Sequence, residues 1–404
     1  MLSEEALEKL SERLVDRIEK LNVYMIRKLA KQILNIGSLT PSQLREVFQS
    51  IKYGSDLDEI IGKISEITNK NVKDIYNIFE EVAKKNQDYA KQFYEYRNID
   101  YITYEKNVEL KSLVRSLAEV TVNNYINISK TCAFAFVDSF GKIQYTSLSD
   151  IYQKITDEAI LSITTGRETY QQVMKRTMKE LSKQGMQDIS YSNGYHRRMD
   201  SSVRMNIMEG VRTLQNTLQK KFGEEFGANG IEVMHHKNPA PDHSSNLEEG
   251  WFDIDGQQFS KEEFDNINSL LNRPVSTLNC YHRYVAIILG VNNPLFSENE
   301  LKRDKEANIE GFEFEGKHYT RYEGTQLQRR LESKIRQYKD LHISASEMAK
   351  LDNDYSDVYK YQEKITQLTR KYKELCEIGN LSTKVERLKI EGYKRIRGVK
   401  DVKR

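Results

Sequence analysis

Proline placement constrains the fold of this chain more than any other feature. Of the five prolines in 404 residues, four lie between Pro239 and Pro294, and the fifth is Pro41. Because proline removes a backbone donor and breaks helix interiors, long helices are expected outside that segment and shorter elements within it. The sequence therefore predicts a mainly α fold, with a small α+β unit inserted before a C-terminal helical hairpin.

The length of the chain, and the change in its pattern from helical to mixed helix and strand signals, predict several structural units. A chain of 404 residues exceeds what one core usually supports. We predict four segments: an all-helical N-terminal unit (1–128), a helical unit (147–229), a small α+β unit with a Cys/His cluster (230–322), and a C-terminal helical hairpin with a basic tail (323–404).

Apolar residues at steps of three and four predict the main helices. One stripe runs from Leu7 to Leu21, and another from Val203 to Leu218 after Asp200 and Ser201, either of which can cap its helix. A heptad-like run from Val358 to Leu375 completes the set. Because helices at chain ends are the freest to pair with another protein, the first and last stripes are predicted docking elements.

Shorter patterns predict a second helix start and the β structure. Thr40 before Pro41 resembles a helix N-terminus. Residues 133–146 suggest a connector or short hairpin, and 231–236 and 284–289 are predicted strands. We expect Ser260 to cap a short helix, and residues 312–323 to form a hairpin about Glu315 and Gly316. These elements give the α+β unit its expected architecture.

The charge balance and the number of cysteines exclude some classes of protein. Lys and Arg number 62 against 60 Asp and Glu, so bulk charge gives no case for a protein that coats nucleic acid. The three cysteines, Cys132, Cys280 and Cys376, are odd in number and far apart, which fits a reducing cytoplasm rather than a disulfide framework. No secretion signal and no apolar run of about 20 residues is present, so no membrane association is expected.

Six of the ten Cys and His residues fall within the α+β segment: His235, His236, His243, Cys280, His282 and His318. Residues two positions apart on an extended chain lie on the same face, so Cys280 and His282 can present sulfur and nitrogen to one ion. We predict His243, Cys280 and His282 as candidate ligands of a structural zinc, with Asp242 or His235 as the fourth.

Two other interpretations of this cluster stay open. Cys280 adjoins an apolar run and can be a buried small side chain, with the histidines bonded to neighbouring carbonyls, in which case the protein has no cofactor. Cys280 and His243 can instead form a nucleophilic pair. The Cys-x-His spacing differs from the usual zinc signatures, which favours the structural interpretation.

The C-terminal tail, residues 389–404, carries seven Lys and Arg residues against Glu391 and Asp401. Such a tail is commonly a solvated chain end. If it acts, DNA is its expected partner, through salt-sensitive contacts with phosphates.

The chain resembles the phage minor capsid protein 2 family over roughly residues 147–395. The resemblance is carried by Arg204-Met205-Asn206, by Pro241-Asp242-His243 and by Asn279-Cys280-x-His282, in that order and spacing. The layout of the α+β segment is also similar to that of Mu F-like head-morphogenesis domains.

This resemblance implies a structural virion protein: a minor head protein of a tailed bacteriophage, placed at or near the portal inside the capsid, and active in head assembly or in DNA packaging and ejection. Portal and capsid proteins are the implied partners, and the implied protein is not an enzyme. The alternative function is a metal-dependent, nuclease-like hydrolase built on His243, Cys280 and His282, although no dense acidic cluster for two-metal chemistry is present.

Overall fold

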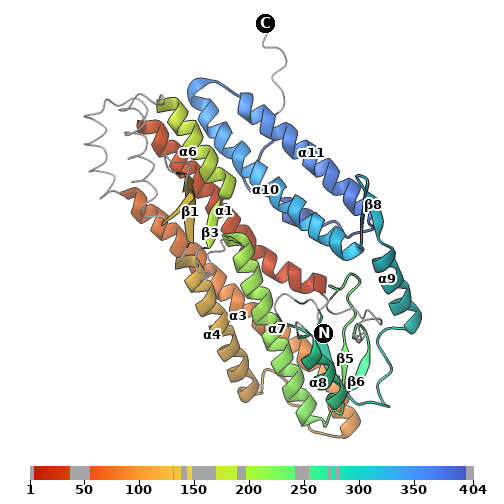
Figure 1. The fold of residues 1–404 in the computed structure, drawn as a ribbon. Coiled ribbons are helices and arrows are strands. Elements are labelled where there is room, and N and C mark those ends of the chain that lie inside the picture. Colours follow the sequence, from red (N-terminus) through yellow and green to blue (C-terminus); the bar gives the residue numbers. More distant parts are fainter. Residues whose placement is uncertain are drawn as a thin grey trace.

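Long helices make up most of the fold (Figure 1). The computed structural model describes residues 4–36, 55–130, 132–137, 143–147, 170–188, 197–241, 254–271, 274–277, 280 and 282–396. Its main helices are α1 (Glu4–Ile36), α3 (Ser55–Arg97), α4 (Val108–Lys130), α6 (Tyr170–Gln184), α7 (Met199–Glu225), α10 (Arg321–Asp352) and α11 (Ser356–Ile378). The predicted fold class, mainly α with a small α+β unit before a C-terminal helical hairpin, is confirmed. The predicted helix start at Thr40 and Pro41 lies outside the described residues.

Helix α7 packs against α1, α3 and α4, and α1 also packs against α10. The predicted stripe from Val203 to Leu218 is buried on α7. Gly210 marks the crossing with α4, because a Cβ there would lie 2.1 Å from the hydroxyl oxygen of Thr121. The close approach of the two helices therefore requires a residue without a side chain at this point.

The prediction that Asp200 or Ser201 caps α7 is wrong. The helix begins at Met199, before either residue, and Arg198 precedes it without a side-chain cap. The carboxylate of Asp200 instead pairs with the guanidinium groups of Arg198 and Arg336, at 3.3 and 3.4 Å. Arg198 also contacts buried Asp340 at 3.0 Å, so this ionic cluster joins α7 to α10.

Both terminal stripes lie inside the protein rather than on its surface. Leu14, Ile18 and Leu21 of α1 are at most 1% exposed and belong to the main core. On α11, the stripe from Val358 to Leu375 is buried, and α10 and α11 form the predicted hairpin (Figure 1). The apolar faces predicted to pair with another protein are therefore covered by this chain itself.

Small antiparallel sheets interrupt the helices. Strands β1 (Cys132–Val137), β2 (Ile143–Ser147), β3 (Met186–Asp188) and β4 (Arg197–Arg198) pair in the order β2-β1-β3-β4. The hairpin expected within residues 133–146 is confirmed by the β1–β2 pairing. In the α+β unit, β5 (Gly230–Val233) lies between β6 (Gln258–Ser260) and β7 (Tyr284–Ile287).

The remaining elements of the α+β unit follow their local sequence signals. Ser260 caps α8 (Lys261–Leu270), as predicted, and forms a capping box with Glu263. Helix α9 (Glu298–Glu310) leads into the hairpin of β8 (Phe312–Phe314) and β9 (Lys317–Tyr319). Its turn residues Glu315 and Gly316 have φ values of +50° and +74°, which the predicted tight hairpin requires. The 3₁₀ turn η2 (Val385–Leu388) follows α11.

Candidate functional site

A cleft of about 720 Å³ brings together the beginning of α1, the segment that follows α11 and the α+β unit. Its walls come from the N-terminal end of α1, which lies beside the α+β unit in Figure 1, from the start of α10, and from residues 381–387. The α+β unit contributes His235, His236, Cys280 and His282. Four members of the predicted Cys/His cluster therefore border one cleft.

The pairing of the small sheet explains this convergence. Strand β5 is antiparallel to both neighbours, and its last residue, Val233, pairs with Tyr284 at the start of β7. Glu232 pairs with Gln258 at the start of β6. Residues that follow β5 and residues that precede β6 and β7 therefore meet at the same edge of the sheet. This places His235, Asp255 and His282 together.

A continuous series of contacts links five side chains at this edge. Asp304 contacts Nε2 of His235 at 3.1 Å, and Nδ1 of His235 lies 2.6 Å from Asp255. The other oxygen of Asp255 lies 3.0 Å from Nε2 of His282, whose Nδ1 lies 3.6 Å from the sulfur of Cys280. Asp255 thus holds two imidazoles at once.

The electrostatic interactions within this series favour the charged forms of its side chains. Burial opposes ionisation of Asp255, but hydrogen bonds from His235 and His282 outweigh it and hold the pKa of its carboxyl well below the usual range. Burial likewise lowers the pKa of His282, yet the contacts with Asp255 and Cys280 raise it to about 9. For His236, burial and the nearby His282 lower the pKa to about 3, so that imidazole is neutral.

Neighbouring elements fix the turn that carries Cys280. The amide of Cys280 donates to the carbonyl of Thr277 at 2.7 Å. The guanidinium of Arg212, on α7, donates to the carbonyl of Cys280 at 2.7 Å. Cys280 and His282 are each 2% exposed. The pair is therefore held rigidly against the main helix of the core.

The Cys280–His282 geometry suits a shared zinc ion. Zinc lies about 2.3 Å from sulfur and about 2.0 Å from nitrogen, so two tetrahedral ligands are separated by roughly 3.5 Å. The observed separation of sulfur and Nδ1 is 3.6 Å. A histidine ligand also usually donates its other ring nitrogen to a carboxylate, which is the relationship of His282 to Asp255.

The other predicted ligands are placed differently. His243 and Asp242 lie outside the described residues. His235 contacts carboxylates through both ring nitrogens, which leaves none for a metal in this arrangement. Among the residues that the structure describes, no group of three Cys, His, Asp or Glu side chains is arranged to hold an ion. A zinc bound to Cys280 and His282 therefore requires a further ligand such as His243, and the site remains a prediction.

The remaining residues of the cluster divide between site and surface. The imidazole of His236 lies 5.6 Å from that of His282, ring centre to ring centre. His318 lies on β9, half exposed, and contacts Glu313. It does not border the cleft.

The sequence patterns single out neither Asp255 nor Asp304 as a site residue. The Asp255-Gly256 pair is itself a turn signal, and Gly256 adopts a φ of +73°. That signal places Asp255 at a strand end, but not beside His282. Asp304 lies in the middle of α9, where no local pattern distinguishes it from an exposed helical carboxylate.

These features define a class: a mainly helical protein with a buried polar network beside a cleft. The Phage minor capsid protein 2 family model matches residues 2–377, and the chain belongs to this family. No curated protein and no solved structure matches it at a significant level. Membership makes the chain a structural protein of the phage virion. Within the part of the chain that the structure describes, no helix is long and apolar enough to span a membrane.

Proposed function

We propose that this protein is a minor head protein of a tailed bacteriophage, located at or near the portal inside the capsid, where it acts in head assembly or in DNA packaging and ejection. One observation carries the proposal: the family match extends over residues 2–377 and therefore includes the helical framework as well as the α+β unit. Portal and capsid proteins are its proposed partners.

The polar network supports a structural rather than a catalytic role. Catalytic zinc sites keep one coordination position open to substrate, whereas structural sites are closed. Cys280 and His282 are each 2% exposed, and the carboxylate that orients His282 also holds His235. A zinc at this point would tie the turn before β7 to its neighbours, which is a stabilising function. The alternative of a metal-dependent hydrolase has no comparable support from the described residues.

A candidate surface for a head-protein partner lies at the connection between α3 and α4. Four apolar side chains there are exposed: Tyr96, Ile99, Ile102 and Val108, at 55, 39, 54 and 79%. Soluble monomers seldom leave several large apolar side chains exposed together, and such groups commonly mark protein contacts. Because the stripes of α1 and α11 are buried, we assign docking to this connection instead.

The test combines detection and disruption. Mass spectrometry of purified virions and procapsids should detect the protein, and the purified portal should retain it in a pull-down. The double variant Ile102→Ser and Val108→Ser should weaken portal retention at least about tenfold, the loss expected when apolar contacts worth about 1.4 kcal/mol are removed. Ile309→Ser, on α9 and 64% exposed, is the matched control.

Absence from both virions and procapsids would overturn the proposed role. Metal-dependent cleavage of DNA or RNA by the purified protein, lost in His243→Ala, would favour the hydrolase instead.

A further inference from the structure

The α10–α11 hairpin carries a groove with an unbalanced charge. The groove has a volume of about 620 Å³ and is lined by residues of both helices and by Glu315 of the β8–β9 turn. Its charged lining comprises five basic side chains and two acidic ones: Arg330, Lys334, Lys364, Arg370 and Lys371 against Glu315 and Glu374. In the whole chain, by contrast, 62 basic residues face 60 acidic ones. Positive charge is therefore concentrated here.

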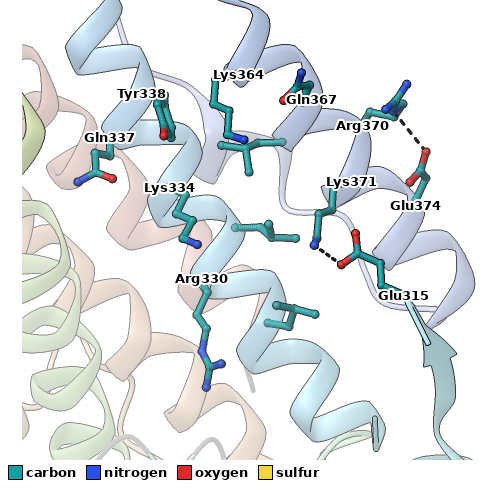
Figure 2. A pocket seen from close by; sticks show the side chains of 13 residues that line it. Glu315, Arg330, Lys334, Gln337, Tyr338, Lys364, Gln367, Arg370, Lys371 and Glu374 are labelled. Atoms are coloured by element: carbon teal, nitrogen blue, oxygen red, sulfur yellow. Dashed lines mark hydrogen bonds and ion pairs between the residues drawn. The ribbon is translucent and has the colours of Figure 1, made fainter. Parts of the chain in front are cut away.

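Ion pairs neutralise only part of this charge. Lys371 pairs with Glu315, and Arg370 pairs with Glu374 at 3.6 Å (Figure 2). Within the described part of the chain, Arg330, Lys334 and Lys364 have no carboxylate partner among the ion pairs. Figure 2 shows these three cations on both walls of the groove, away from the two glutamates. Like charges that share a groove repel one another, and a bound anion offsets that repulsion.

The floor of the groove indicates what kind of anion fits. Leu331 and Leu368 line it but are only 4 and 9% exposed, because the hairpin core already covers them. An amphipathic helix from a partner protein would gain little by burying such a floor. The rim of the groove carries ammonium and guanidinium groups beside the partly exposed side chains of Leu327 and Tyr338. The excess of positive charge on this rim favours an anionic partner.

The length of the basic row fits a linear polyanion. Arg330 and Lys334 lie one turn apart on α10, a rise of about 6 Å, and Lys364 lies across the groove on α11. One strand of a DNA duplex presents a phosphate about every 3.4 Å along its axis. Arg330 and Lys334 therefore match about two successive phosphates, and Lys364 adds a third cation from the opposite wall. A compact anion would contact fewer of these groups.

We propose that the groove between α10 and α11 binds the phosphate backbone of nucleic acid without sequence preference, with Arg330, Lys334 and Lys364 as the contacting cations. The inference rests on the proposed function in one respect: inside a phage head, the nucleic acid available is the packaged genome. The binding chemistry itself depends only on the groove.

The experiment measures the salt dependence of binding by the full-length protein. The probe is a fluorescein-labelled DNA duplex of 30 base pairs, prepared in two unrelated sequences. Its binding is measured by fluorescence anisotropy at salt concentrations from 50 to 200 mM NaCl. The triple variant Arg330→Gln, Lys334→Gln, Lys364→Gln should reduce the slope of log affinity against log salt by about 3, close to one per lost phosphate contact, and equally for both sequences.

A second triple variant separates the groove from general charge. Lys73→Gln, Lys106→Gln and Lys220→Gln remove the same charge from exposed positions on α3, on the α3–α4 connection and on α7. This control should retain the wild-type slope. All the replaced side chains are exposed, so both variants should keep the wild-type circular dichroism spectrum and melting temperature.

Two results would overturn the inference. The first is a groove variant with the slope of the wild type or of the control. The second is tighter binding of a polyglutamate peptide than of the duplex at equal salt, lost in the groove variant, which would assign the groove to an acidic protein. Virion proteomics tests the proposed function separately. If the protein is present in virions but does not bind DNA, only the proposal for the groove is contradicted. If it binds DNA but is absent from virions, only the proposed virion role is contradicted.

Discussion

Asp255 and His282 are joined by a buried contact of 3.0 Å between a carboxylate oxygen and Nε2 of the imidazole. The same carboxylate also holds His235 at 2.6 Å and accepts from the backbone amide of His236 at 2.7 Å. One side chain from the turn before β6 therefore organises the end of β5 and the start of β7. Its loss would leave two imidazoles without their shared anion.

Asp255→Asn should consequently destabilise the protein by about 3 kcal/mol, because removal of one partner of a buried ion pair leaves uncompensated charge. Urea unfolding followed by circular dichroism measures this change. Asp265→Asn, an exposed position on α8, should change the free energy of unfolding by less than about 0.5 kcal/mol. Equal stabilities of the two variants would show that the network contributes no net stability.

The metal prediction is tested by comparing two buried cysteines. If zinc binds Cys280 and His282 together with His243, elemental analysis of the purified protein should find about one equivalent, and Cys280→Ser should lower both metal content and melting temperature. Cys376→Ser is the matched control, because Cys376 is equally buried but lies in the α10–α11 core. That variant should keep its metal.

A folded, metal-free wild-type protein would contradict the zinc prediction. Cys280→Ala would then behave as an ordinary core substitution and cost roughly 1 to 3 kcal/mol.

Glu19 on α1 predicts a pH dependence of stability. Burial raises the pKa of Glu19 to about 8, reinforced by the negative charge of Asp200 and opposed by Arg336 and Arg198. A carboxyl with a raised folded pKa contributes stability that is fully present below its unfolded value of 4.5 and is lost as pH rises through the folded value. The wild type should therefore lose a few kcal/mol between pH 5 and pH 8, by the linkage of about 1.4 kcal/mol per pKa unit.

The variant Glu19→Gln removes this titration. Its free energy of unfolding should vary less with pH than that of the wild type, with the largest gain at pH 8. Glu224→Gln, at an exposed position on α7, should keep the wild-type profile. Parallel profiles for wild type and Glu19→Gln would show that Glu19 is ionised in the folded protein.

Burial of the first helix predicts that it is part of the folding unit. Ile18 is 1% exposed, so Ile18→Ala should cost about 2 to 5 kcal/mol in transfer and cavity energy. Ile61→Ala removes the same atoms from a side chain that is 51% exposed, and should change stability by less than about 0.5 kcal/mol. Thermal unfolding of the two variants gives the comparison. A similar small effect at both positions would place α1 outside the core.

Local patterns in the sequence were sufficient for much of the fold. The spacing of apolar residues predicted the buried faces of α1, α7 and α11, since a helix brings every third and fourth side chain to one side. Ser260 predicted the start of α8, and Glu315-Gly316 predicted the hairpin turn. Each of these features depends on neighbours within a few positions, so no knowledge of distant contacts was needed.

Tertiary structure alone decided which partners these elements meet. The stripes of α1 and α11 indicated apolar faces but not whether another chain or this one covers them, because periodicity carries no information about the partner. In the sequence, Asp200 is a suitable helix cap, but in the folded protein its carboxylate pairs with Arg198 and Arg336 instead. Asp255, His282 and Asp304 are separated by 27 and 22 positions in sequence, and only the antiparallel pairing of β5 with β6 and β7, together with the packing of α9, brings their side chains within hydrogen-bonding reach of one network.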